Sequence, residues 1–205
     1  MNIEVFTADL HAMNVLDEAA SILSADERER ADRFRFAQHR QRFTRCRILL
    51  RQLLGQHLAR DPASLVFRYG EWGKPELDGV HFNVSHSDRI AVIAWSREHA
   101  VGIDVERIDR TKDVVPLAHT AFSPAECEAF DAMPADQQVE AFFRTWARKE
   151  ALMKLRGRGF SLPSHSFTVS VAKEPLTFLD DCAIRDLDVN AGFACAIAAA
   201  PEALL

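Results

Sequence analysis

Two charged side chains, Glu150 and Lys154, stand inside the apolar stripe of a predicted helix. The segment 143–159 reads FRTWARKEALMKLRGRG, and apolar residues such as Phe143 and Met153 recur on one face at helical spacing. Burying an unpaired charge is costly, so Glu150 should either have a partner in a cleft or hold a cation. The alternative is a partly exposed structural ion pair, because Glu four residues before Lys is a favourable order on a helix.

A second pair of acids, Asp104 and Glu106, lies on a predicted strand over residues 101–108. Alternation along a strand places both on one face. The opposite face carries the apolar residues Val101, Ile103 and Val105. Neighbouring carboxylates repel, so one must raise its pKa or a cation must bind. Oxygen ligands without His or Cys favour Mg²⁺ or a similar hard ion, to which Glu150 could add a third carboxylate. Acids that simply face solvent are the alternative.

The segment 82–87, FNVSHS, runs from the predicted strand 80–85 into residues 85–89, which fit a hairpin connection to the next strand. Alternation turns Asn83 and Ser85 to the same side. We expect His86 at the tip of the hairpin, where its ring can donate a hydrogen bond to a phosphate. A surface histidine without a ligand is the alternative.

A further candidate anion site combines Gly73-Lys74-Pro75 with an arginine-rich stretch. The glycine permits a close approach, and the proline fixes the direction of Lys74. Residues 21–60 hold ten Arg and four acids, although the whole chain has a net charge of -5. Such a local excess is typical of a surface that binds anions, either nucleic acid or a phosphorylated small molecule. A solvated helix face with ion pairs is the alternative. The glycine spacing excludes a Walker-type phosphate loop.

The elements that position these residues repeat along the chain. Ser24 and Ser123 each begin a capping box, and each box precedes a long helix and later strands. We therefore expect an α+β fold that is a pseudo-dimer of two similar halves, residues 1–100 and 101–205. Each half would be a small antiparallel sheet packed with helices, with a ligand cleft between the halves. A chance likeness between two α+β halves is the alternative.

The element positions follow from periodicity and turn residues. Strands are expected at residues 3–6, 65–69, 80–85, 90–95, 101–108, 167–171, 187–189 and 193–198. Long helices are expected at residues 41–54 and 143–159, each preceded by a shorter helix after its capping box.

Composition narrows the class of protein. With 48% hydrophobic and 27% charged residues, the 205-residue chain resembles an ordinary soluble globular protein. No apolar run approaches the roughly 20 residues that span a bilayer, and residues 1–10 do not resemble a signal peptide. The four Cys are scattered, which argues against a zinc site and a disulfide framework. We expect a cytoplasmic protein.

The motifs GKP, FNVSHS, VGIDVER and WARKEALMKLRGRG follow one another in a specific order. Over residues 24–161 this order resembles the Sfp-type 4′-phosphopantetheinyl transferases. The resemblance implies a monomeric pseudo-dimer with coenzyme A between its halves. It also implies Mg²⁺-dependent transfer of 4′-phosphopantetheine from coenzyme A to a serine hydroxyl of an apo acyl or peptidyl carrier protein, with release of 3′,5′-ADP.

The resemblance also implies roles for the matching residues. Asp104, Glu106 and Glu150 would hold Mg²⁺ with the pyrophosphate of coenzyme A. Glu150 would also be the general base for the carrier serine, directly or through a water. Lys154 would contact the phosphates, with Lys149 close by. Further coenzyme A contacts are expected from Arg30, Lys74, Pro75, Asn83, Ser85 and His86, with Arg47 and Arg51 as additional candidates.

The same resemblance implies a separate role for each half. Residues 1–100 would contact the nucleotide of coenzyme A, and residues 101–205 would hold the metal and dock the carrier protein. An apolar docking surface with basic edges is expected near residues 122–130. No membrane or nucleic-acid partner is implied.

Two other functions remain open. A non-catalytic regulator could bind coenzyme A or a nucleotide, although Lys154 and all three carboxylates are present. A nucleic-acid-binding module could use the arginine-rich helices, but it offers no reason for the acids at residues 104 and 106.

Overall fold

The two long amphipathic stretches of the sequence form the two longest helices, and each covers one antiparallel sheet. The computed structural model describes residues 3–174 and 176–204. Its first half contains β1 (Glu4–Asp9), α1 (Ala19–Ile22), α2 (Ala25–Asp32), α3 (Ala37–Leu58), β2 (Arg68–Tyr69), β3 (Pro75–Glu76), β4 (His81–Ser87) and β5 (Ile90–Ser96). Its second half contains β6 (Val101–Arg107), α4 (Val115–Ala121), α5 (Pro124–Asp131), α6 (Ala135–Leu155), β7 (Thr177–Leu179), β8 (Cys182–Asp186), β9 (Phe193–Ala199) and α7 (Pro201–Leu204).

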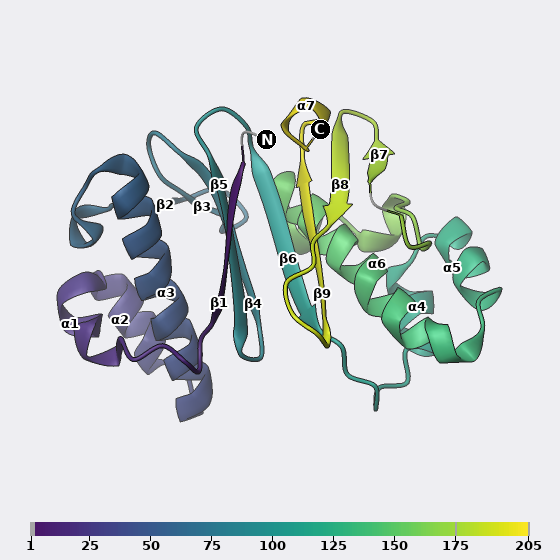
Figure 1. Ribbon diagram of the computed structural model, residues 1–205, viewed down its shortest axis with the longest axis horizontal. Coiled ribbons are helices and arrows are strands. Elements are labelled where there is room, and N and C mark those ends of the chain that lie inside the picture. The colour runs from purple at the N-terminus through teal and green to yellow at the C-terminus, as the bar shows by residue number, and fades with distance from the viewer. Residues whose placement is uncertain (1–2, 175, 205) are drawn as a thin grey trace.

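The strands form two main sheets, in the orders β1-β5-β4 and β6-β9-β8-β7, with β2 and β3 as a separate pair. All the pairings are antiparallel. Helices α3 and α6 lie on opposite outer sides of the molecule, with both sheets between them (Figure 1). The prediction of an α+β fold with two halves and antiparallel sheets is therefore confirmed.

Strand alternation divides the core into layers. Ile90, Val92 and Ala94 of β5 face the second sheet, where they meet Ile103 and Val105 of β6. The intervening β5 residues, Ile93 and Trp95, face Leu50 and Leu54 of α3. On the other side of the molecule, Ala147 and Ala151 of α6 pack against Ile184 and Ala196 of the second sheet.

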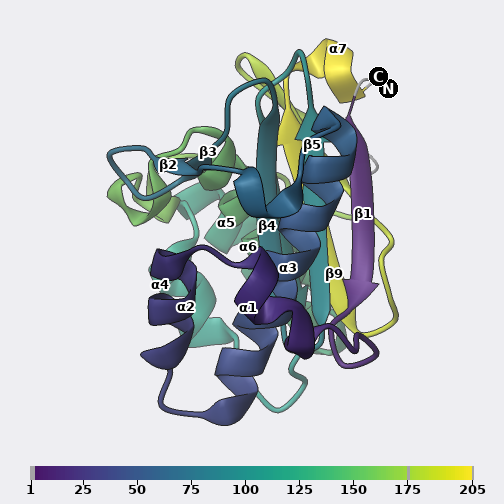
Figure 2. The same ribbon diagram turned by 90° about the vertical axis from the view of Figure 1, so that its left-hand side faces the viewer.

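The first strand also links the halves. Ile3, just before β1, packs with Ala203 and Leu204 of α7 in the core between the sheets. The start of β1 lies beside α7 in both views of the molecule (Figures 1 and 2). None of the helices in the described part of the chain combines the length and apolarity needed to cross a membrane.

Both capping boxes form as the sequence predicts. The backbone N–H of Ser24 donates to Glu27 Oε2 at 3.1 Å. The backbone N–H of Ser123 donates to Glu126 Oε2 at 2.7 Å, and Ser123 Oγ accepts from the Glu126 N–H. Both glutamates are buried, so each also serves the tertiary structure.

Several element boundaries differ from prediction. Helix α6 begins eight residues earlier than expected, because Pro134 stands at its N-cap rather than ending a separate segment. Strand β2 covers only the end of residues 65–69, and the last antiparallel pair is β8 with β9 rather than residues 187–189 with 193–198. Helix α4 and strand β7 were not predicted.

Residues 167–171 form no strand, although their apolar residues alternate. Val169 and Val171 are buried against the second half. Their backbone partners are side chains instead of another strand. Val169 N–H donates to Glu126 Oε1 at 2.6 Å, and the carbonyls of Phe167 and Ser170 accept from Lys149 and Arg148 of α6.

The two sheets meet where β4 lies beside β6, yet no ladder joins these strands. Side chains of β4 bond to the free edge of β6 instead. Asn83 Oδ1 accepts from the Ile103 N–H at 2.9 Å, and Ser87 Oγ accepts from the Arg107 N–H at 3.0 Å. This junction sets the position of β4 side chains relative to those of β6.

Candidate functional site

The site begins with a glycine that lets a helix approach a strand. A Cβ atom on Gly102 would lie 2.0 Å from the Ala151 carbonyl oxygen and 2.3 Å from the Leu155 nitrogen of α6. Only glycine permits this approach. The contact brings Glu150 and Lys154 of α6 to the face of β6 that carries the predicted acids.

Side chains from three elements converge there. Lys154 Nζ lies 2.5 Å from Asp104 Oδ1, 2.9 Å from Ser85 Oγ and 3.7 Å from Glu150 Oε2. Ser85 Oγ also donates to Asp104 Oδ1 at 2.8 Å. Strand β4, strand β6 and helix α6 therefore bring together four of the residues that the sequence analysis selected.

Glu106 lies at the edge of this group. Its Oε2 accepts from Ser87 Oγ at 3.1 Å. Burial and the charge of Asp104 raise the pKa of Glu106. Burial, Asp104 and Glu106 raise the pKa of Glu150 to about 7. Burial alone would lower the pKa of Lys154, but the carboxylates of Asp104 and Glu150 outweigh it and raise that pKa. The cluster thus carries more negative than positive charge.

The donor set suits a hard cation. Asp104 is only 2% exposed, and its Oδ2 atom has no hydrogen-bond partner among the described residues. Mg²⁺ prefers oxygen ligands, and its charge would relieve the mutual repulsion of the carboxylates. As the side chains stand, however, no three His, Cys, Asp or Glu residues of the described chain are grouped as metal ligands. The Lys154 ammonium is the cation between Asp104 and Glu150.

A cavity of about 330 Å³ adjoins the cluster. It is lined by six of the residues expected to contact coenzyme A: Arg30, Arg47, Pro75, Ser85, His86 and Lys154. The other lining residues are Phe43, Cys46, Tyr69, Gly73 and Val84. Its positive and aromatic lining could hold a phosphorylated nucleotide, because cations attract phosphate and rings stack on a base.

Sequence reasoning misplaced one residue of this cavity and missed the nearby guanidinium of Arg42. His86 lies within β4 opposite Ala91 rather than at the hairpin tip. Partial burial and the charges of Lys154, Arg42 and His39 lower the pKa of His86. The arginine-rich composition was a signal for Arg42, but only the fold shows which face of α3 meets β4.

Asn83 and Lys149 serve the structure. Asn83 is 5% exposed, and its Oδ1 is occupied at the β4–β6 junction. Lys149 Nζ lies 2.7 Å from Glu126 Oε2 and 2.8 Å from the carbonyls of Ser164 and Phe167. Successive residues of a helix do not share a face, so Lys149 points into the protein while Glu150 faces the site. This placement directs the Lys149 ammonium away from the face that carries Glu150.

Three other candidate cations are also engaged. Arg47 Nε and Arg51 Nε lie 2.8 Å and 2.6 Å from the buried carboxylate of Glu27, so Arg51 belongs to the interior and Arg47 only borders the cavity. Lys74 does not line the 330 Å³ cavity, and its ammonium contacts backbone carbonyls of α6 and β6. The ring-bearing residues Phe122 and Phe130, expected on a docking surface, are buried in the core.

Comparison with known proteins gives two family matches. A family model described as the 4′-phosphopantetheinyl transferase superfamily matches residues 100–198. A second, described as 4′-phosphopantetheinyl transferase, N-terminal, matches residues 12–98.

Curated relatives carry the same description. The chain is 32% identical over 193 residues to a 4′-phosphopantetheinyl transferase of Bacillus subtilis, covering 90% of this chain and 85% of the relative. It is 30% identical over 190 residues to 4′-phosphopantetheinyl transferase Sfp of Bacillus subtilis (strain 168), covering 88% and 83%. It is 40% identical over 152 residues to 4′-phosphopantetheinyl transferase HetI of Nostoc sp. (strain PCC 7120), covering 71% of this chain but only 64% of that relative.

Proposed function

Because this chain belongs to the Sfp-type 4′-phosphopantetheinyl transferase family, we propose that it moves the 4′-phosphopantetheine group of coenzyme A to a serine hydroxyl of an apo acyl or peptidyl carrier protein. The observation that supports this most is the convergence of Ser85, Asp104, Glu150 and Lys154 beside a cation-lined cavity. Neither a regulator nor a nucleic-acid-binding module needs a carboxylate of raised pKa at that position.

In this proposal residues 1–100 supply the nucleotide contacts. Arg30 and His86 line the cavity, and Arg42 adds positive charge near His86. Arg30 also lies over the ring of Phe43, with 5.3 Å between its Cζ atom and the ring centroid. These groups would hold the phosphates and adenylate of coenzyme A by charge attraction and hydrogen bonds.

Residues 101–205 would hold the metal. Asp104, Glu106 and Glu150 are the carboxylates that would bind Mg²⁺, and the unpartnered Asp104 Oδ2 supports this assignment. When bound, the ion would neutralise charge on the pyrophosphate. Lys154 would then be free to donate to a phosphate oxygen, because its ammonium lies at the boundary between the carboxylates and the cavity.

Glu150 is the proposed general base. The carrier serine oxygen attacks the β-phosphorus of coenzyme A, and the bond from that phosphorus to the bridging oxygen of 3′,5′-ADP breaks. Glu150 accepts the serine proton, directly or through a water. A positioned carboxylate base contributes about 10²–10⁴-fold.

We place carrier docking on the face formed by α4 and α6. A cavity of about 320 Å³ next to Glu106 is lined by apolar groups that include Leu117, Phe143 and Trp146. Leu117 of α4 is 41% exposed. This surface replaces the expected one near residues 122–130. Both halves are present in one chain, so we expect a monomer.

The proposal is tested by incubating the protein with coenzyme A, Mg²⁺ and a panel of apo acyl and peptidyl carrier proteins. Mass spectrometry should show the addition of one phosphopantetheine to at least one carrier. Glu150→Gln should lower the rate by about 10²–10⁴-fold, whereas Lys173→Met, at an exposed position, should leave it unchanged. Tight binding of coenzyme A with no transfer to any carrier would favour the regulator instead.

A further inference from the structure

The C-terminal end of α6 depends on partners outside the helix. The last carbonyls of any helix lack intrahelical donors. Three are satisfied locally. Arg156 N–H donates to the Leu152 carbonyl at 2.9 Å, Gly157 N–H to the Lys154 carbonyl at 3.2 Å, and Arg158 N–H to the Met153 carbonyl at 3.3 Å. Gly157 makes this turn with a φ of 67°, as a glycine at the end of a helix commonly does.

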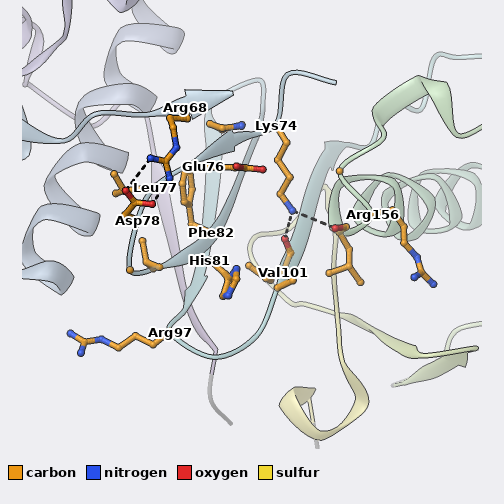
Figure 3. A pocket seen from close by; sticks show the side chains of 16 residues that line it. Arg68, Lys74, Glu76, Leu77, Asp78, His81, Phe82, Arg97, Val101 and Arg156 are labelled. Atoms are coloured by element: carbon orange, nitrogen blue, oxygen red, sulfur yellow. Dashed lines mark hydrogen bonds and ion pairs between the residues drawn. The ribbon is translucent and has the colours of Figure 1, made fainter. Parts of the chain in front are cut away.

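Lys74 completes this end from the other half of the molecule. Its Nζ lies 2.8 Å from the Lys154 carbonyl and 3.5 Å from the Leu155 carbonyl. It also lies 3.1 Å from the carbonyl of Val101, the first residue of β6. Figure 3 shows the side chain of Lys74 reaching the carbonyl of Val101. One ammonium with three N–H donors therefore ties the β3 end of the first half to both α6 and β6.

The direction of Lys74 differs from that of its neighbours. Gly73 and Pro75 line the 330 Å³ cavity, and Lys74 does not. Lys74 lines a different cavity of about 590 Å³, together with Arg97 and Arg156 (Figure 3). Its stem also lies near Gly157, where an added Cβ would be 3.6 Å from Lys74 Cδ. An ammonium committed to helix carbonyls is not available to a phosphate.

The contact between the Lys74 ammonium and α6 is favourable only because the C-terminal end of the helix is negative. Burial lowers the pKa of Lys74 to about 8, and Glu76 opposes this shift. Positive charge is stabilised near the C-terminus of a helix, where the carbonyl dipoles converge. Val101 has no strand partner on this edge of β6. The Lys74 ammonium therefore supplies its carbonyl with the hydrogen bond that a neighbouring strand would otherwise donate.

We propose that Lys74 is a positioning residue that holds the last turn of α6 in register with β6. Its acceptor is the backbone carbonyl of Lys154, whose side chain reaches Asp104 and Ser85. Glu150 stands one turn earlier on the same helix. Catalytic groups displaced by about 1 Å can lose about 100-fold in rate, so a small shift of this turn reduces turnover. The kinetic part of this inference rests on the proposed transferase function.

Lys74→Met removes the ammonium and keeps most of the stem. The expected result is a fall in kcat of about 10- to 100-fold, while the ratio of binding constants for coenzyme A and 3′-dephospho-coenzyme A stays within about twofold of the wild-type ratio. Loss of that ratio with kcat unchanged would make Lys74 a ligand of the 3′-phosphate and overturn the inference. Unchanged kcat and unchanged ratio would overturn it as well. Lys173→Met is the matched control.

A second readout does not require turnover. Hydrogen exchange followed by mass spectrometry should show faster exchange of the Gly157 and Arg158 amides in Lys74→Met than in wild type or Lys173→Met. Equal protection in all three proteins would contradict a role in holding this turn. If the wild type modifies no carrier, the transferase proposal fails and the exchange result still decides the role of Lys74. Should Lys74→Met not fold, Lys74→Gln, which keeps an N–H donor, is measured instead.

Discussion

At the scale of single residues, the candidate site is a set of acids with one internal cation. Lys154 Nζ is 2.5 Å from Asp104 Oδ1 and 3.7 Å from Glu150 Oε2. Burial and the neighbouring carboxylates, which one ammonium does not balance, raise the pKa values of both Glu106 and Glu150. A bound divalent ion would lower them again.

This imbalance predicts how stability depends on pH. The pKa of Glu150 in the folded protein is about 7, against an ordinary value of 4.5. Since the folded value is higher, its favourable contribution is present below about pH 4.5 and is lost as pH rises through about 7. In EDTA, the thermal midpoint of the wild type should therefore fall relative to that of Glu150→Gln between about pH 5 and pH 8. Parallel curves would show that Glu150 titrates normally.

At the scale of elements, α6 uses two faces for two purposes. Lys154 contacts Asp104 of β6 and lines the cavity, and Glu150 lies beside Lys154. Arg148 and Lys149 point away from it, and their donors bind Asp186, Glu126 and the backbone carbonyls of the segment that follows the helix. Truncating a member of such a buried ion pair is strongly destabilising, so activity lost in Lys149 variants would report on folding.

The close approach of α6 to β6 predicts the effect of one methyl group. In Gly102→Ala the new Cβ would lie 2.0 Å from the Ala151 carbonyl oxygen, so the helix must move away from Asp104. We expect carrier modification to slow by about 100-fold and the free energy of unfolding to fall by about 1–3 kcal/mol. Gly70→Ala is the control, because its Cβ would meet the flexible end of Glu76 at 3.3 Å and the Lys74 carbonyl oxygen at an ordinary contact distance of 3.8 Å. Equal rates in the two variants would argue against this packing as the source of the geometry.

At the scale of the whole molecule, the site exists only where the halves meet. Ser85 comes from the first half, and Asp104 and Lys154 come from the second. Side chains rather than a strand ladder join β4 to β6, and Lys74 adds a second connection at the end of α6. The position of one half therefore affects the site in the other.

The assembled site predicts that binding of coenzyme A depends on a divalent ion. Without it, the pyrophosphate would approach three buried or half-buried carboxylates, and like charges repel more strongly where water is excluded. Calorimetric titration should give an affinity about tenfold or more weaker in EDTA than in Mg²⁺, with recovery when excess Mg²⁺ is restored. Equal affinity in both buffers would count against the three acids as the metal site.

The sequence by itself determined the family, the α+β class with two halves and the strand face that carries Asp104 and Glu106. Each of these follows from patterns between residues close together in the sequence. Examples are the alternation along β6 and the capping boxes at Ser24 and Ser123. Tertiary structure alone decided the partners of the cations. Lys74 binds the end of α6, Lys149 binds Glu126, and Arg47 and Arg51 bind Glu27. A long cationic side chain takes the nearest desolvated acceptor, and that acceptor can lie up to 81 residues away in the chain.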